Sequence, residues 1–174
     1  MPSPRSVALT RHPSAVGELL LGVTEDALVY CGFQDLDTVR GRIARAGLTE
    51  REQAPSERQR ELLARTAREL DAYLAGRATA FAVPVDPCLA TPFSRETVLA
   101  LDAFVPYGHT TTYKELAMAL DRPRASRAVG TALGANPLCV VLPCHRVLAS
   151  DGSLAGYAGG LDAKRHLLAL EQRP

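Results

Sequence analysis

A cysteine followed directly by a histidine, Cys144 and His145, is the strongest candidate for chemistry in this sequence. The segment 143–147 reads Pro-Cys-His-Arg-Val, with an apolar stretch before it and a glycine-rich stretch after it. Only the thiolate is a strong nucleophile, and the ordinary pKa of a thiol is about 8.5. A neighbouring base or cation can make the thiol reactive near neutral pH. The same pair also occurs as a buried structural cysteine beside an incidental histidine, so the surrounding residues must decide.

Length and composition place the chain among ordinary globular proteins. It has 174 residues, of which 47% are hydrophobic and 22% charged, which suits one domain or two small ones. No apolar run follows residues 1–5, so we expect no secretory leader and a cytoplasmic location. The net charge of +1 argues against a general electrostatic hold on nucleic acid.

The cysteines are expected to be free thiols, because nothing indicates an oxidising compartment. Cys139 and Cys144 lie five residues apart, and no second Cys or His pair has zinc-finger spacing. We therefore expect no metal site and no cofactor. Cys31 follows an apolar segment and is expected in the core.

The N-terminal half predicts a small sheet with helices. Residues 17–23 and 27–31 flank a three-residue turn, which indicates a hairpin. Residues 37–46 have helical spacing, and a capping box from Ser56 to Gln59 begins a helix that Gly76 ends. Residues 79–85 alternate like an edge strand. A proline-rich linker then divides a domain of residues 1–86 from one of residues 87–174.

The C-terminal half predicts mainly helices. Ser94 is expected to cap a helix that ends before residues 106–108, and a capping box from Thr112 to Glu115 begins a short helix through Leu120. A turn separates it from a helix over 125–133, which makes a helix-turn-helix candidate. The last helix is expected over 162–171.

The second helix of this pair has few long polar side chains. It offers no Asn or Gln to read adenine in the major groove. Its one arginine, Arg127, could wedge into a base stack from the minor groove. Four arginines between residues 121 and 146 face one acid, Asp121, and form a modest basic patch: Arg122, Arg124, Arg127 and Arg146.

Taken together, these motifs closely resemble the O6-alkylguanine-DNA alkyltransferases, also called methylguanine-DNA methyltransferases. The resemblance covers about half of the chain, from Phe93 to Glu171. Its segments are 106–108, 112–113, 126–130, 136–137, 143–147, 156–160 and 170–171. It implies a mixed α/β (α+β) fold, with a ribonuclease H-like N-terminal sheet and a helical C-terminal domain that contains the helix-turn-helix.

The resemblance also implies roles for the site residues. Cys144 would accept the alkyl group, with His145 as base through a bound water and Glu171 orienting His145. Asn136 would brace the cysteine turn. The remaining contacts to guanine would come from Tyr113 at N3, the main chain of Cys144 and Val147 at the amino group, the main chain of Ala158 at O6, and Tyr157 over the base.

The implied partner is alkylated double-stranded DNA, bound in the minor groove. The damaged base must leave the stack to be reached, and Arg127 would fill its place. The other expected DNA contacts are Thr112, Ala125, Ser126, Ala128 and Gly130. The product, an S-alkylcysteine, would make each molecule react once, with O6-alkylguanine and also O4-alkylthymine as substrates. A monomer is expected, and cooperative assembly on DNA remains an open alternative.

Three other functions remain as alternatives. A non-catalytic damage sensor of the alkyltransferase-like type typically has tryptophan where this chain has Cys144. A cysteine hydrolase would need an oxyanion hole and would leave the arginine-bearing helix without a role. A helix-turn-helix regulator would need side chains that read bases on its second helix.

Overall fold

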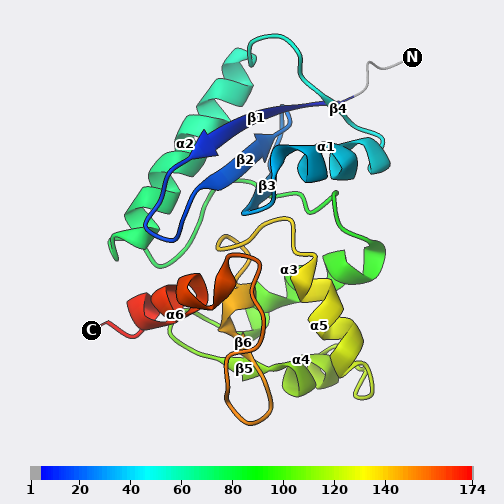
Figure 1. The fold of residues 1–174 in the computed structure, drawn as a ribbon, viewed down its shortest axis with the longest axis vertical. Coiled ribbons are helices and arrows are strands. Elements are labelled where there is room, and N and C mark those ends of the chain that lie inside the picture. The colour runs from blue at the N-terminus through cyan, green and yellow to red at the C-terminus, as the bar shows by residue number, and fades with distance from the viewer. Residues whose placement is uncertain (1–4, 174) are drawn as a thin grey trace.

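The computed structural model describes residues 5–173, which form a small sheet with two helices and, below it in Figure 1, a mostly helical C-terminal half. This confirms the expected mixed α/β class. Residues 1–4, which entered the expectation about a leader, and residue 174 lie outside the described residues. Within residues 5–173, no helix has the length and apolar character needed to cross a membrane. The domain boundary at residues 86 and 87 stays a prediction.

The N-terminal sheet has four strands in the order β3-β2-β1-β4. They are β1 (Ser6–His12), β2 (Leu19–Val23), β3 (Leu28–Gly32) and β4 (Thr49–Glu50). β2 is antiparallel to β1 and β3, so the expected hairpin is confirmed, whereas β4 runs parallel to β1. The sequence analysis missed β1 because its second half is polar and exposed, and missed β4 because two residues carry no periodicity.

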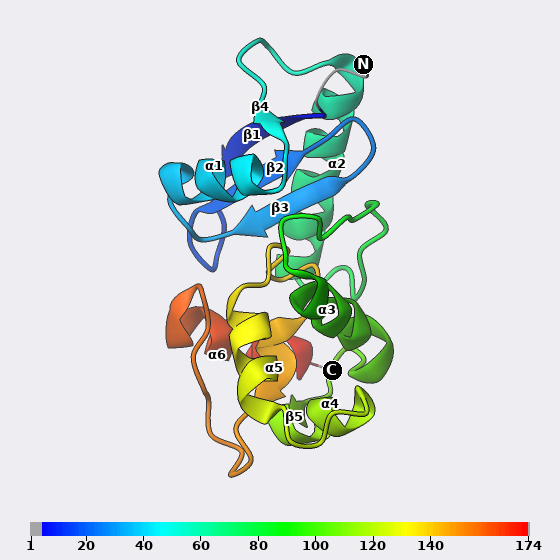
Figure 2. The ribbon, with the colours of Figure 1, turned by 90° about the vertical axis from the view of Figure 1, so that its right-hand side faces the viewer.

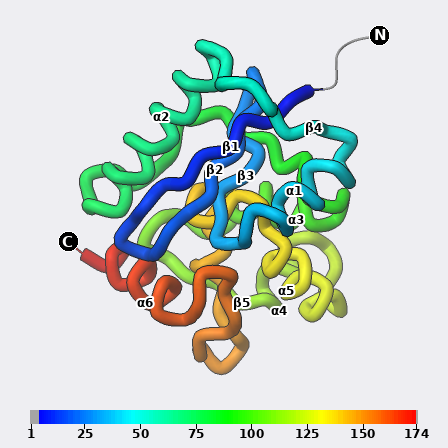
Figure 3. The backbone as a smooth tube through the Cα atoms, turned by 45° about the horizontal axis from the view of Figure 1, so that its top comes forward, coloured from blue at the N-terminus to red at the C-terminus, as the bar shows by residue number. Residues whose placement is uncertain are grey.

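Two helices, α1 (Leu36–Arg45) and α2 (Glu57–Leu74), cover opposite faces of this sheet (Figure 3). Successive side chains of a strand point to opposite faces. Leu19 and Leu21 of β2 therefore belong to the cluster that contains Leu70 of α2, whereas Leu20 packs with Ile43 of α1. The capping box at the start of α2 is confirmed.

The expectation of an edge strand over residues 79–85 is wrong. Only Val85 pairs with the sheet, through an isolated parallel bridge to Leu28. The carboxylate of Glu69 on α2 accepts the backbone N–H groups of Ala82 and Val83, at 2.8 and 2.9 Å. A side chain therefore takes the donors that a neighbouring strand would need.

The C-terminal half contains four helices and two short strands that pair in parallel. They are α3 (Pro92–Phe104), β5 (Thr111–Thr112), α4 (Tyr113–Ala119), α5 (Ser126–Gly134), β6 (Val147–Leu148) and α6 (Gly160–Glu171). The capping box before α4 is confirmed. The expected cap at Ser94 is wrong: Thr91 caps α3, and the Ser94 hydroxyl donates to the carbonyl of Ala132 on α5 at 2.8 Å.

Strand β3 joins the two halves through its backbone (Figure 2). The N–H of Cys31 donates to the carbonyl of Pro137, and the N–H of Cys139 donates to the carbonyl of Cys31, both at 2.8 Å. The segment that leads to Cys144 is therefore hydrogen-bonded to the edge of the N-terminal sheet. Cys31 itself is fully buried, as expected.

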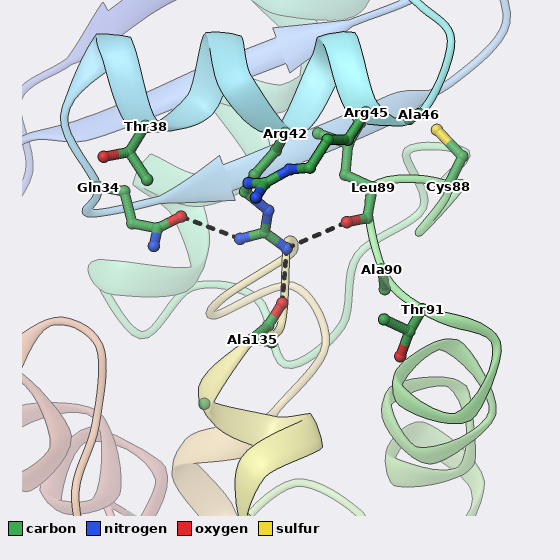
Figure 4. Close-up of a pocket in the computed structure, with 11 residues that line it drawn as sticks. Gln34, Thr38, Arg42, Arg45, Ala46, Cys88, Leu89, Ala90, Thr91 and Ala135 are labelled. Carbon is green, nitrogen blue, oxygen red and sulfur yellow. Dashed lines mark hydrogen bonds between the residues drawn. The ribbon is translucent and has the colours of Figure 1, made fainter.

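A second junction is made by Arg42 on α1, which lines an open groove of about 550 Å³ (Figure 4). Its guanidinium donates to the carbonyl of Ala135 after α5 at 2.6 Å, to the side chain of Gln34 at 3.0 Å and to the carbonyl of Leu89 at 3.4 Å. One side chain thus fixes α1 against the end of α5.

Replacing Arg42 by methionine should lower the free energy of unfolding by about 1–2 kcal/mol, because charged hydrogen bonds between the halves are lost. Urea unfolding of Arg42→Met would measure this effect. Arg45→Met, which changes an exposed side chain one turn further along the same helix, should leave stability nearly unchanged. Equal effects of the two substitutions would contradict the assigned role of Arg42.

Candidate active site

Cys144 begins a single 3₁₀ turn, Cys144–Arg146, that follows two tight reversals of the backbone. The N–H of Val141 donates to the carbonyl of Cys139, and the N–H of Cys144 donates to that of Leu142, both at 2.8 Å. Each is a γ-turn, and the first requires a φ of 70° at Val140. A β-branched residue is strained there, so the surroundings must hold it.

Asn136 supplies part of that support from a buried position. Its side-chain amide donates to the carbonyl of Leu142 at 3.1 Å, and its side-chain oxygen accepts the N–H of Leu138 at 2.9 Å. Both ends of the strained segment are therefore attached to one side chain. The main-chain carbonyl of Asn136 also accepts the thiol of Cys139 at 3.6 Å.

The Cys144 thiol is only 7% exposed, yet its surroundings favour the thiolate. The neighbouring thiol of Cys139 lowers the pKa of Cys144; burial opposes this, while Asn136 and the charge of Lys164 add to the lowering. Cys144 in turn raises the pKa of Cys139, which therefore stays a thiol. Sequence reasoning noted that Cys139 is close in the chain but assigned it no role.

His145 and Glu171, which the sequence analysis paired, are in direct contact. Nε2 of His145 lies 2.6 Å from Oε1 of Glu171, and both side chains are buried. Burial lowers the pKa of His145, against the attraction of Glu171, so the imidazole favours its neutral form. Burial alone would raise the pKa of Glu171, but hydrogen bonds from His145 and Arg146 lower it to about 2.

The expected basic patch is smaller than predicted, because Arg146 does not belong to it. It is buried rather than surface-exposed, and its Nε donates to Oε2 of Glu171 at 2.9 Å while Nη1 donates to the carbonyl of Val105 at 2.9 Å. Arg122 pairs with Glu96 at 3.1 Å. Within residues 5–173, only Arg124 and Arg127 of the four arginines form no ion pair with a carboxylate.

Two buried residues at this site were missed by the sequence analysis. Tyr73 on α2 donates its hydroxyl to Oε1 of Glu171. Lys164 on α6 donates to the carbonyls of Val147 and Ala155, at 2.7 and 3.2 Å. Each lies on the buried face of its helix, beside Leu70 of α2 and Leu167 of α6, which was the available signal.

A pocket of about 360 Å³ opens at Cys144. This volume lies in the range of roughly 300–1,000 Å³ that is typical of small-molecule sites. Its lining unites five predicted site residues: Tyr113, Gly130, Cys144, Tyr157 and Ala158. The hydroxyl of Tyr157 is buried and has no hydrogen-bond partner within residues 5–173.

The side chain of Val147 is fully buried and does not line that pocket. Its carbonyl accepts Lys164 and therefore has one lone pair left for another donor. Lys164 in turn ties β6 to the loop before Tyr157.

The predicted helix-turn-helix is present as α4 and α5, which pack together (Figure 2). Arg127, Ala128 and Thr131 are exposed on one face of α5, so small side chains surround the arginine. Ala125 and Ser126 lie at the start of α5 and are partly buried. Thr112 caps α4 directly before Tyr113.

No group of three or more potential metal ligands gathers within the described part of the chain. The polar side chains that gather behind the Cys144 turn are those of His145, Arg146, Lys164 and Glu171. They suit nucleophilic chemistry at the thiol.

Family models match both halves of the chain. The model described as the 6-O-methylguanine DNA methyltransferase ribonuclease-like domain matches residues 9–87, and the one described as its DNA binding domain matches residues 92–173. A methylated-DNA–protein-cysteine methyltransferase of Methanosarcina barkeri is 38% identical, over 91% of this chain and 93% of its own length.

Solved structures agree with these matches. The O6-methylguanine methyltransferase of Mycobacterium tuberculosis superimposes with a TM-score of 0.75 at 34% identity, covering 95% of this chain and 93% of its own. A structure of the same organism's protein in complex with DNA gives 0.73 at 34% identity, covering 96% and 92%. An O6-methylguanine-DNA methyltransferase of Pyrococcus kodakaraensis gives 0.65 at 26%, covering 95% and 98%. The chain therefore belongs to the 6-O-methylguanine DNA methyltransferase family.

Proposed function

We propose that this protein repairs DNA by transferring the alkyl group of O6-alkylguanine in duplex DNA to its own Cys144. The observation that carries the proposal is the pocket at Cys144, whose thiol has a lowered pKa and lies beside a helix-turn-helix. The relative solved in complex with DNA supports DNA as the partner.

Cys144 attacks as the thiolate, and His145 takes its proton through a water molecule. Nε2 of His145 faces Glu171, whereas the buried Nδ1 has no hydrogen-bond partner within residues 5–173 and is the nitrogen left for that water. Glu171 fixes the ring and stabilises the imidazolium, as in a catalytic triad. The S–C bond forms as the bond from carbon to O6 breaks, and the electron pair leaves with guanine.

Residues in and around the pocket bind the flipped guanine. Tyr113 donates to N3 and offsets charge on the departing guanine, while the main-chain amide of Ala158 donates to O6. The carbonyls of Cys144 and Val147 accept the amino group, and Tyr157 covers the ring. O4-alkylthymine presents a similar alkyl ether and is the second substrate.

The helix α5 enters the minor groove with its small exposed face. Arg127 occupies the space of the base that flips into the pocket, which costs a few kcal/mol of unstacking. Close approach of α5 uses Ala125, Ala128 and Gly130, with Ser126 and Thr112 at the helix starts. Contacts to phosphate supply much of the affinity, so binding weakens with salt.

The thioether product has no easy hydrolytic exit, so each molecule reacts once. The reaction needs no cofactor or metal. We place the protein in the cytoplasm, as a monomer.

Intact mass after mixing with excess duplex that contains one O6-methylguanine tests the proposal. We expect a gain of about 14 Da, one CH₂, because a methyl replaces the thiol proton. Cys144→Ser should gain nothing, whereas Cys88→Ser, which changes a half-buried thiol elsewhere, should gain the same mass as the unmodified chain. Lesion binding without added mass would make the protein a damage sensor, and neither binding nor mass would overturn the proposal.

Arg127→Ala should slow transfer from duplex DNA about tenfold or more, because the flipped state loses the side chain that fills the stack. Transfer from a free O6-alkylguanine base should stay unchanged, since no stack is opened. Rapid-quench kinetics on both substrates would measure the difference. Arg58→Ala, an exposed arginine on α2, serves as control; an equal loss on both substrates would contradict the role of Arg127.

The transfer rate should fall in acid as Cys144 and His145 gain protons, and the fall should begin at a lower pH than for an ordinary thiol and imidazole, because the pKa values of both groups are lowered. Asn136→Ala removes a hydrogen bond that favours the thiolate, so the pKa of Cys144 rises and the fall begins at higher pH. Rate measurements across pH check this. An unchanged profile would show that Asn136 acts only on the turn.

A further inference from the structure

We propose that Tyr73, on α2 of the N-terminal half, is a positioning residue for the proton relay formed by Cys144, His145 and Glu171: its hydroxyl holds the Glu171 carboxylate and limits the attraction of that carboxylate for a protonated His145. The inference rests on the proposed function, because it assigns a role within that relay. It extends the reactive site into the half of the chain that carries neither the thiol nor the DNA-binding helices.

The position of Tyr73 is fixed on all sides. The residue is 1% exposed, and its hydroxyl donates to Oε1 of Glu171 while lying 3.4 Å from Nε2 of His145. Its ring packs against Phe81, with centroids 5.0 Å apart, and edge-on against Tyr107 at 5.9 Å. The ring packing therefore holds the hydroxyl against the Glu171 carboxylate.

Three hydrogen-bond donors converge on Oε1 of Glu171. This oxygen accepts hydrogen bonds from Nε2 of His145 at 2.6 Å, from Nη2 of Arg146 at 3.0 Å and from the hydroxyl of Tyr73. Each further donor draws negative charge away from the imidazole. A His145 whose carboxylate is shared in this way binds a proton less readily and remains a base.

Other charged and titratable groups also surround His145. Arg146 and Lys164 oppose a positive imidazole, whereas Glu171 favours one. The adjacent Cys144, as a thiolate, also favours one. From the loop before α6, the ring of Tyr157 approaches edge-on at 6.5 Å, and burial raises the pKa of its phenol, which stays protonated. The balance at His145 therefore depends on how much of the Glu171 charge it receives.

Tyr73→Phe removes the hydroxyl and keeps the ring packing. With one donor fewer on Oε1, His145 should protonate at a pH about half a unit to one unit higher, the size expected for one hydrogen bond. The acid fall of the transfer rate should move up by the same amount. Tyr30→Phe is the matched control, because Tyr30 is equally buried but its hydroxyl bonds to Gln34, away from the relay.

The test is a double-mutant cycle of Tyr73→Phe with Glu171→Gln, read by NMR titration of the His145 imidazole in the unalkylated protein and assigned by His145→Gln. We expect the upward shift when Glu171 is present and none when the chain also carries Glu171→Gln. No shift in either background, or equal shifts in both, would overturn the proposal. Tyr73→Met repeats the cycle if the phenylalanine variant fails to fold.

The titration does not depend on alkyl transfer, so the two proposals fail separately. A chain that shows the shift but gains no methyl group would overturn the proposed function and leave the positioning contact of Tyr73 in place. A chain that gains a methyl group with an unshifted His145 would overturn the role of Tyr73 alone.

Discussion

One buried carboxylate, that of Glu171, is the constraint on which the architecture depends. It is nearly inaccessible to water and accepts donors from Tyr73, His145, Arg146 and the backbone N–H of Gly108. A buried charge that loses one partner costs about 3–5 kcal/mol. Three separate parts of the chain must therefore meet at the end of α6, and the site forms where they do.

The N-terminal sheet supports the reactive segment although it supplies no nucleophile. Its strand β3 holds residues 137–139 by backbone hydrogen bonds, and Phe33 just after β3 packs edge-on against Tyr157 at 5.8 Å. A Cβ at Gly159 would lie 2.6 Å from the Phe33 ring, so glycine is needed for this close approach. The strained turn and the pocket loop thus rest on the same strand.

Local signals in the sequence predicted the local structure well. The capping boxes at Ser56 and Thr112 mark real helix starts, because a cap depends on residues only three apart. The edge strand over 79–85 failed because Glu69, distant in sequence, takes its backbone donors. The predicted cap at Ser94 was wrong for a similar reason, since its hydroxyl donates to a carbonyl on α5.

At the site, too, contacts between residues close in sequence could be predicted, and contacts between distant residues could not. The pairing of His145 with Glu171 came from a family resemblance, not from spacing, and the structure places the two side chains in contact. Arg146 looked like surface charge because nothing in a local window reveals a buried partner 25 residues away. Tyr73 and Lys164 were missed for that reason too, because their hydrogen-bond partners lie far away in the sequence or on another element.

The bridge between Cys31 and Leu138 also bears on the order of folding. It joins positions far apart in the chain, and such non-local pairings close late because the intervening loop must first be ordered. Until that bridge closes, nothing holds Cys139 and Asn136 beside Cys144. The surroundings that favour the thiolate of Cys144 are therefore a property of the folded chain and not of the segment 136–144 alone.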